Sequence, residues 1–236
     1  VPGKVKFCKF NDVSHLKKLV NKKTVAIIIE FVQGDGGINI CSKNFAKAIK
    51  GICKNKKILL IGDEIQGGIG RTGKIFAYKH YGVNPDIITS AKGLGSGIPI
   101  GATIVKKYIS KIISTGFHGS TFGGGMLQTR VSYNVFKTIN TKRFLNKVLI
   151  NGNLLSSLIK KMHHLHKDKI VDTRCLGLMA GVEFKNNQIA LKTYEKMSKN
   201  GLISTLIQGN IIRLTPPLTV STGEIRKAIK IITQSL

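Results

Sequence analysis

Short apolar runs alternate with a helical pattern in the first half of the chain. The runs are rich in isoleucine and valine and have the length of buried strands; they cover residues 25–30, 58–61, 86–89 and 98–105. Residues 42–54 repeat their apolar positions with helical spacing, and a short basic helix is expected around 13–21, after a strand-like start. The order strand, helix, strand predicts an α/β fold with a mostly parallel sheet.

The second half has longer helical patterns. Residues 126–167 predict one long helical stretch, and shorter helices are expected at 188–200 and 221–235. Between them, residues 174–184 indicate a turn followed by a strand, and residues 211–218 indicate a strand that prolines stop. These patterns favour a second, smaller α/β domain.

Length and composition narrow the class of protein. With 236 residues and 42% hydrophobic residues, the chain can bury a substantial core. We expect a large-domain part in residues 1–142 and a small C-terminal domain in residues 143–236. No apolar run reaches the ~18 residues that a membrane span requires, and no secretory signal precedes the first predicted strand. The four cysteines are scattered, which fits a reduced cytoplasm and indicates no metal site.

The formal net charge of +27 raises the question of nucleic-acid binding. The lysines, however, are spread along the chain together with many isoleucines and asparagines, three residue types with A/T-rich codons. Tryptophan is absent, and no pattern of aromatic and basic residues suited to base stacking is found. We therefore interpret the charge as compositional bias and expect no nucleic-acid partner.

The candidate chemistry centres on Lys92, which lies among serine, alanine and glycine in residues 90–97. Small residues leave room for a flat ligand, and glycine allows close backbone approach. A poorly hydrated lysine amine loses its proton more easily and becomes a nucleophile. The alternative is a surface lysine in a glycine-rich turn.

Asp63 is the second candidate, because the apolar run 58–61 leads directly into Gly62-Asp63. Ligands of open α/β sheets bind at the carboxyl ends of strands. A lysine that bonds to an aldehyde, together with a carboxylate beside a cationic ring nitrogen, is what pyridoxal phosphate requires. Asp63 alone is more typical of a strand-end cap; its pairing with Lys92 favours the cofactor.

Several motifs in one order resemble the class III aminotransferases, which use pyridoxal phosphate. They are Asp63-Glu64-Ile65-Gln66, Gly70-Arg71-Thr72-Gly73, the stretch from His80 to Asp86, and Ser90-Ala91-Lys92. The similarity runs from about Phe10 to the C-terminus and is strongest to the acetylornithine branch. It implies the fold type I architecture, a partial large domain plus the small C-terminal domain. Since it begins inside the family's large domain and the first residue is valine, we expect the C-terminal part of a longer protein.

The resemblance assigns roles around the cofactor. Lys92 would bond to the aldehyde of pyridoxal phosphate and then move a proton during the reaction. Asp63 would face the ring nitrogen, and Gln66 would hydrogen-bond the ring's phenolic oxygen. Glu64 and Ile65 belong to the same cofactor-binding loop, in which we expect Glu64 to act mainly in structure.

The resemblance also assigns substrate contacts. Arg213 would hold the α-carboxylate of 2-oxoglutarate or glutamate, as a guanidinium grips a carboxylate through two parallel hydrogen bonds. Asp35 matches a family glutamate that pairs with this arginine and releases it, and is one methylene shorter. Ser120 would touch substrate, and Thr121 would reach across a homodimer interface to the partner's cofactor phosphate.

The implied reaction is amino transfer between N2-acetylornithine and 2-oxoglutarate, in arginine or also lysine biosynthesis. Ornithine and 4-aminobutyrate aminotransferases are the nearest alternatives. An inactive remnant that only dimerises or binds a partner is a further alternative, because the main phosphate loop of the family cannot be assigned here.

A different chemistry is suggested by residues 68–73, which spell the dinucleotide pattern G-x-G-x-x-G after a strand. Glycines crowd this region, and no acidic residue ends a second strand about 20 positions further on. We therefore favour the aminotransferase over a hydride-transfer enzyme.

Overall fold

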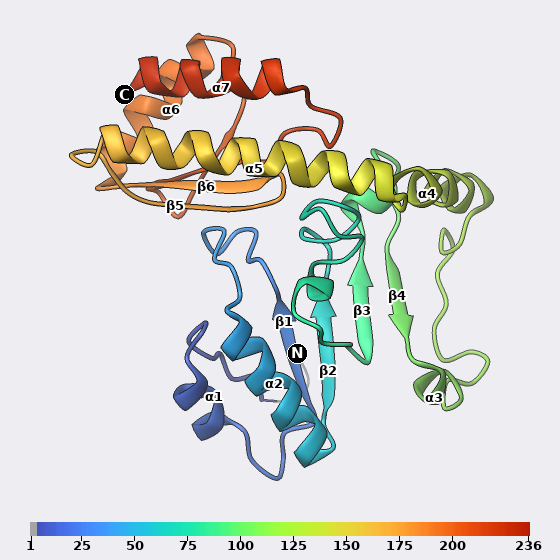
Figure 1. Cartoon of the computed structure of the whole chain (residues 1–236). Coiled ribbons are helices and arrows are strands. Elements are labelled where there is room, and N and C mark those ends of the chain that lie inside the picture. Colours follow the sequence, from blue (N-terminus) through green and yellow to red (C-terminus); the bar gives the residue numbers. More distant parts are fainter. Residues whose placement is uncertain (1–3) are drawn as a thin grey trace.

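The computed structural model describes residues 4–236, which form two four-stranded sheets (Figure 1). The first sheet has the order β1-β2-β3-β4, with β1 at Ala26–Glu30, β2 at Leu59–Asp63, β3 at Ile87–Ser90 and β4 at Ala102–Val105. β1, β2 and β3 are parallel, and β4 is antiparallel to β3. The mostly parallel α/β sheet predicted from the sequence is confirmed.

The parallel register brings the ends of three strands together. Glu30, the last residue of β1, pairs with Asp63, the last residue of β2. Asp63 in turn pairs with Thr89 in β3. Two separate apolar runs therefore deliver carboxylates to one edge of the sheet, where β3 also leads into the segment with Lys92.

One face of this sheet is covered by helices α1 (Val13–Leu19) and α2 (Lys43–Lys56). The Ser42 hydroxyl caps α2 by accepting a hydrogen bond from the backbone N–H of Phe45. Lys57 ends the helix in the left-handed conformation. The apolar face predicted for this helix is buried and packs on β1 and β2.

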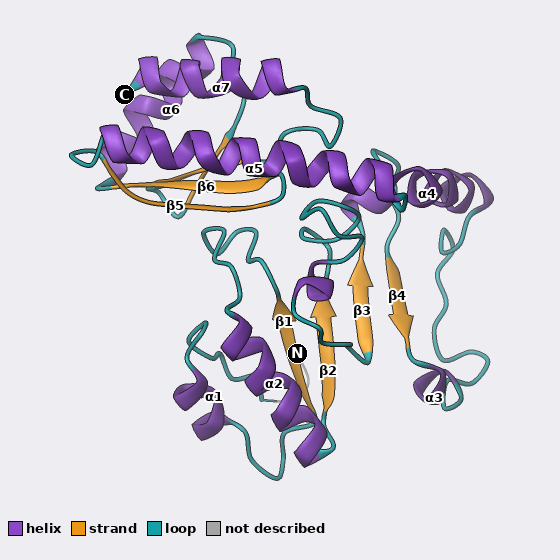
Figure 2. Cartoon of the chain, in the orientation of Figure 1, coloured by secondary structure: helices purple, strands orange, loops and turns teal. Residues whose placement is uncertain are grey.

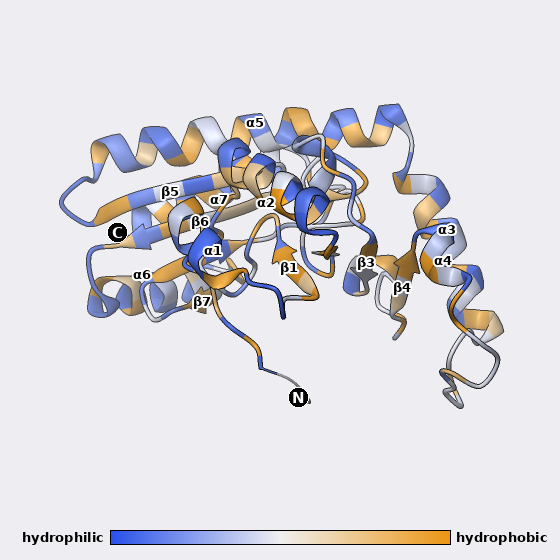
Figure 3. Cartoon of the chain, turned by 90° about the horizontal axis from the view of Figure 1, so that it is seen from below, coloured by the Kyte–Doolittle hydropathy of each residue, from blue (hydrophilic) through white to orange (hydrophobic). Residues whose placement is uncertain are grey.

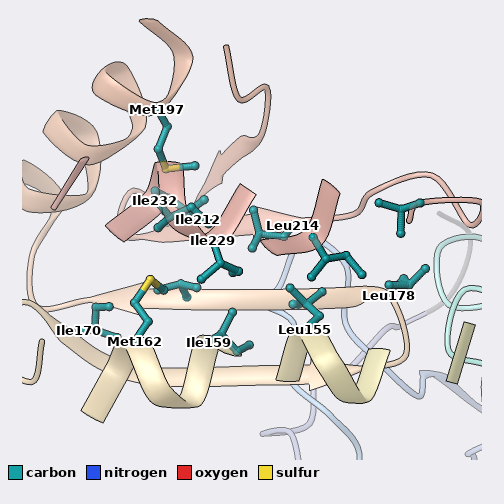
Figure 4. Close-up of a cluster of buried hydrophobic side chains, with 14 of the residues drawn as sticks. Leu155, Ile159, Met162, Ile170, Leu178, Met197, Ile212, Leu214, Ile229 and Ile232 are labelled. Atoms are coloured by element: carbon teal, nitrogen blue, oxygen red, sulfur yellow. The ribbon is translucent and has the colours of Figure 1, made fainter. Parts of the chain in front are cut away.

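The second sheet is antiparallel and has the order β5-β6-β8-β7. Its strands are β5 at Ile170–Leu176, β6 at Met179–Phe184, β7 at Thr205–Ile207 and β8 at Ile211–Leu214. It packs against three helices, α5 (Lys142–Leu165), α6 (Asn187–Lys199) and α7 (Thr222–Ser235), seen in the upper part of Figure 2. Figure 4 shows the core between them, in which Ile159 and Met162 of α5 and Ile229 and Ile232 of α7 meet the strands.

Helix α5 alternates hydrophilic and hydrophobic residues along its length (Figure 3). Its buried residues recur at the spacing of one helix face: Val148, Asn151, Gly152, Leu155, Ile159 and Met162. The helix has 24 residues, but lysines interrupt its apolar positions. Within residues 4–236, no helix combines the length and apolar character needed to cross a membrane.

Some predicted boundaries were wrong. The helical stretch 126–167 is two helices, α4 (Met126–Ile139) and α5, because Thr141 starts a new helix by accepting a hydrogen bond from the N–H of Phe144. Residues 4–12 form no strand, and residues 1–3 of the predicted start lie outside the described part. The strand predicted at 98–105 covers only Ala102–Val105.

Two strands of the second sheet were not predicted. The segment 174–184 is not a turn and a strand but the end of β5, a turn at 177–178 and β6. β5 was missed because Asp172, Thr173 and Arg174 interrupt its apolar pattern, and β5 is an edge strand of the sheet. β7 has only three residues and gives no periodic signal.

We expect Gly152→Ala to lower the free energy of unfolding by about 1–3 kcal/mol. A Cβ on Gly152 would lie 2.5 Å from the carbonyl oxygen of Gly177, in the β5–β6 turn, and backbone cannot yield as a flexible side chain can. Chemical denaturation measures the change. Gly51→Ala in α2 is the matched control, because its Cβ would meet nothing within 4 Å; it should stabilise by about 0.5–1 kcal/mol. Equal effects of the two substitutions would contradict the packing argument.

Candidate active site

Lys92 lies just beyond the carboxyl end of β3, in the 3-10 turn Lys92–Leu94. Its backbone φ is 43°, a left-handed conformation that is strained for a side chain of this size. Such strain is found preferentially at functional sites. The side chain is exposed and lies at the sheet edge where β1 and β2 end on Glu30 and Asp63.

Four charged groups at this edge act on one another electrostatically. Burial raises the pKa of Glu30, the carboxylates of Asp63 and Asp35 raise it further, and the charge of Lys92 lowers it. The Glu30 carboxylate also accepts a hydrogen bond from the N–H of Gly34 at 3.0 Å. The structure thus brings Lys92, Asp63 and Asp35 close enough to Glu30 for each of them to shift its pKa.

Arg213, Asp35 and Gln66 form a hydrogen-bonded group beside this edge. Nη1 of Arg213 donates to Oδ1 of Asp35 at 2.7 Å and to Oε1 of Gln66 at 3.3 Å. Nε2 of Gln66 donates to Oδ2 of Asp35 at 3.0 Å. The shorter side chain of Asp35 therefore still reaches the arginine.

The environments of the two charges differ. The side chain of Arg213 is 16% exposed and that of Asp35 is 75% exposed. The hydrogen bond from Arg213 lowers the pKa of Asp35, and Gln66 and Lys92 lower it further, so Asp35 is ionised. Among residues 4–236, Nε of Arg213 is one of the few buried side-chain atoms without a hydrogen-bond partner. The guanidinium thus retains a donor for an anionic ligand.

The two acids at the end of β2, Asp63 and Glu64, have different surroundings. Oδ1 of Asp63 accepts from the N–H of Ile65 at 3.0 Å. Glu64 is fully buried and accepts from the N–H groups of Ala77 at 2.7 Å and Tyr78 at 2.9 Å. Burial raises the pKa of Glu64 to about 7, although both hydrogen bonds oppose this shift. Its carboxylate holds the following turn, the structural role expected for it.

Ser120 and Thr121 lie in the exposed segment between α3 (Lys107–Ser110) and α4, on the outer side of β4 in Figure 1. In the part of the chain that the structure describes, neither hydroxyl hydrogen-bonds to another residue. The structure does not bring them into the hydrogen-bonded group around Arg213. Their assigned roles, at substrate and at a dimer interface, stay predictions.

The glycine-rich stretch 68–73 is a turn between β2 and β3 that contacts loops of the second sheet. Nη1 of Arg71 donates to the carbonyl oxygens of Leu178 and Pro216, and burial lowers the pKa of Arg71 to about 10. The next helix is the short 3-10 turn Ala77–His80, so no helix begins directly after the glycines. The dinucleotide pattern therefore lacks the helix N-terminus that would bind a pyrophosphate.

Two groups at the site had been given no role from the sequence. Glu30 ends an apolar run, the same signal that identified Asp63, and could have been found by it. Gln208 donates from Nε2 to the backbone oxygen of Asp35 at 2.7 Å. No sequence signal identifies Gln208, because its contact depends on how the two sheets face each other. In residues 4–236, no three His, Cys, Asp or Glu side chains gather as a metal site would require.

Comparison with known proteins identifies the class. The family model for class-III aminotransferases matches residues 3–236, and the chain belongs to this family. The resemblance inferred from the motifs is confirmed, and so is the fold. The ornithine aminotransferase of Toxoplasma gondii superposes with a TM-score of 0.92 at 29% identity, covering 100% of this chain and 57% of that one.

Two curated relatives are more similar in sequence, at 38–40% identity. The acetylornithine aminotransferase of Methanocaldococcus jannaschii is 40% identical over 229 residues, covering 95% of this chain and 56% of the relative. Ornithine aminotransferase 1 of Staphylococcus saprophyticus is 38% identical, and the match covers 98% of this chain and 58% of the relative. The chain thus spans rather more than half the length of the curated relatives it matches.

Class III aminotransferases use pyridoxal phosphate, and the residues present fit this group. An exposed amine and a strand-end carboxylate lie at one sheet edge, as an aldehyde and a cationic ring nitrogen require. The buried, unpartnered Nε of Arg213 fits the carboxylate of an amino-acid substrate. The family implies amino-acid and keto-acid substrates.

Proposed function

We propose that this chain carries the catalytic lysine and the small domain of an acetylornithine aminotransferase, which transfers the amino group of N2-acetylornithine to 2-oxoglutarate. The product pair would be N-acetylglutamate semialdehyde and glutamate, in arginine or also lysine biosynthesis. The observation that best supports this proposal is that Lys92, Asp63 and the Asp35–Arg213 pair lie at one edge of the first sheet. The acetylornithine aminotransferases among the relatives support the substrate.

Lys92 and Asp63 would hold the cofactor from two sides. When bound, pyridoxal phosphate supplies an aldehyde that takes up amino groups and a ring that withdraws electrons. The Lys92 amine would bond to that aldehyde, and, once displaced by substrate, would move the proton from the substrate Cα. The Asp63 carboxylate would keep the ring nitrogen protonated. Gln66 would give up its hydrogen bond to Asp35 and hydrogen-bond the phenolic oxygen of the ring instead.

Arg213 would bind the α-carboxylate of glutamate or 2-oxoglutarate. In the absence of that carboxylate, Asp35 neutralises the guanidinium, so that no unpaired charge remains. A substrate whose reacting carbon bears no carboxylate, such as N2-acetylornithine at its terminal amine, would leave this pair intact. Asp35 and Arg213 would thus let one site accept both a dicarboxylate and N2-acetylornithine.

Ser120 and Thr121 would complete the site from the exposed segment. In a homodimer, Thr121 would donate to the phosphate of the partner's cofactor, and Ser120 would contact substrate. The exposure of both residues supports a role at such an interface.

Covalent trapping tests the proposed cofactor site. The purified chain is mixed with pyridoxal phosphate and reduced with borohydride, and its peptides are analysed by mass spectrometry. We expect the pyridoxyl group on the peptide with Lys92. Labelling spread evenly over the many exposed lysines would overturn the proposal.

An ornithine aminotransferase is the second candidate, because relatives of that activity match nearly as well. Amino donors separate the two. With 2-oxoglutarate as acceptor, faster formation of glutamate from N2-acetylornithine than from ornithine supports an acetylornithine aminotransferase. The reverse preference supports the second.

We expect Arg213→Ala to weaken binding of glutarate, a non-reacting dicarboxylate, by about 10- to 100-fold. The reason is the loss of charge-assisted hydrogen bonds worth about 1.5–3 kcal/mol. Isothermal titration calorimetry measures the affinity. Arg226→Ala, on the exposed face of α7, is the matched control and should bind glutarate as the unaltered chain does. Equal affinity of both variants would exclude Arg213 as the carboxylate-binding residue.

A further inference from the structure

The loop that carries Asp35 is held by the second sheet. We call residues 33–39, between β1 and α2, the acid loop. Besides Arg213, two side chains of the second sheet hydrogen-bond to its backbone: Arg174 of β5 donates to the carbonyl oxygen of Gly37, and Gln208 donates to that of Asp35. The position of the acid loop therefore depends on residues far away in the chain. Arg174 is 137 positions from Gly37, and Gln208 is 173 positions from Asp35.

Gln208 lies in the link between β7 and β8 and has a backbone φ of 51°. The paired residues Ile207 and Ile211 close this link over three residues. A left-handed conformation is unfavourable for a residue with a Cβ, and only a surrounding structure that over-determines it keeps it there. The strained turn aims the Gln208 amide at Asp35 O, 2.7 Å away.

Gln208 and Arg213 belong to the same β-hairpin and hold the same residue. Gln208 binds the backbone oxygen of Asp35, and Nη1 of Arg213 binds its carboxylate and the backbone oxygen of Gly34. An aspartate side chain is short, so its carboxylate reaches a guanidinium only if its backbone is close. The Gln208 hydrogen bond provides this closeness, because it fixes the Asp35 carbonyl against the hairpin that carries Arg213.

We propose that Gln208 is a positioning residue that sets how strongly Asp35 competes with a substrate carboxylate for Arg213. This proposal rests on the proposed function of Arg213 as the carboxylate-binding residue. With the hydrogen bond in place, Asp35 is preorganised against Arg213, and a dicarboxylate must displace it. Without it, the acid loop moves away more easily and Arg213 is more available. Gln208 thus tunes the selection between dicarboxylate and monocarboxylate substrates.

The first test needs no ligand. Carbon-detected NMR follows the titration of the Asp35 carboxyl in the unaltered chain, in Gln208→Ala and in Gln208→Asn. Asparagine tolerates the left-handed conformation well, so the turn folds, but its amide is one methylene shorter. We expect the Asp35 pKa to rise toward its ordinary value in both variants. In Arg213→Ala, adding Gln208→Ala should change it no further.

The second test measures competition directly. Glutarate affinity should increase by about 2- to 10-fold in Gln208→Ala, the factor that corresponds to one hydrogen bond of ordinary strength. In an Asp35→Ala background, adding Gln208→Ala should have no further effect. A merely structural role would change affinity equally in both backgrounds. Gln188→Ala, exposed on α6, is the matched control.

The outcomes separate this proposal from the one it rests on. If the Asp35 pKa is the same with and without Gln208, the positioning role is overturned, whatever glutarate does. If the pKa rises as expected but glutarate affinity does not depend on Arg213, the proposed function fails instead. If affinity depends on Arg213 but Gln208→Ala changes it equally with and without Asp35, Gln208 acts only on the turn.

Discussion

Lys92→Ala is expected to abolish covalent trapping of pyridoxal phosphate and to slow amino transfer by about 10²- to 10⁴-fold, the usual contribution of a positioned acid or base. Alanine lacks the amine that we propose bonds to the aldehyde and, once displaced, moves the Cα proton. The backbone should fold as before, because the Lys92 side chain is exposed and no hydrogen bond from its amine is found in the described residues. Alanine and lysine both carry a Cβ, so the left-handed backbone at φ 43° is strained to a similar degree in the variant and in the unaltered chain.

Two readouts check this result. Mass spectrometry of the whole chain after borohydride reduction should find no stoichiometric pyridoxyl group, and an assay of glutamate formation should show the loss of rate. Lys107→Ala is the matched control, since Lys107 is exposed on α3, 15 residues further along the chain. Full trapping in Lys92→Ala would exclude this lysine as the cofactor's attachment point.

The strands β1, β2 and β3 could be predicted because each is a compact apolar run in the parallel part of the sheet. Asp63 was found for the same reason: a polar residue directly after such a run lies at the carboxyl end of the sheet. The break between α4 and α5 was missed because Asn140 and Thr141 interrupt the apolar pattern without a glycine or proline. β5 was missed because its central residues are polar.

The pairing of Asp35 with Arg213 could not be derived from local pattern. The two residues are 178 positions apart and meet because the two sheets face each other across the acid loop. Only the family resemblance pointed to it. Neither the local pattern nor the family resemblance pointed to Gln208. Its role depends on its left-handed backbone conformation and on a contact with a residue far away in the chain.

Glu64 should make the protein less stable as the pH rises from about 4.5 to about 7. Burial raises the pKa of Glu64 from 4.5 to about 7 in the folded state. The folded protein therefore holds this proton more tightly than the unfolded chain does. Stability from this group is fully present below pH 4.5 and is lost as the pH passes through the folded pKa. The loss amounts to about 3 kcal/mol when complete.

Glu64→Gln isolates this effect from the titration of all other groups. Glutamine cannot ionise, so the free energy of unfolding of the variant should lack this pH-dependent component. Its amide oxygen can still accept from the N–H of Ala77 or Tyr78, but not from both, since the other position now carries N–H donors. The variant should therefore be less stable than the unaltered protein at pH 4.5, and the difference should narrow or reverse toward pH 8.

Urea denaturation at several pH values measures both curves. Glu195→Gln on the exposed face of α6 is the matched control and should parallel the unaltered protein throughout. If the curve of Glu64→Gln also ran parallel, Glu64 would carry no raised pKa, and its carboxylate would be ionised against the two backbone N–H groups. The turn from Ala77 to His80 would then be anchored by a charge rather than by a neutral acid beside the cofactor-binding loop.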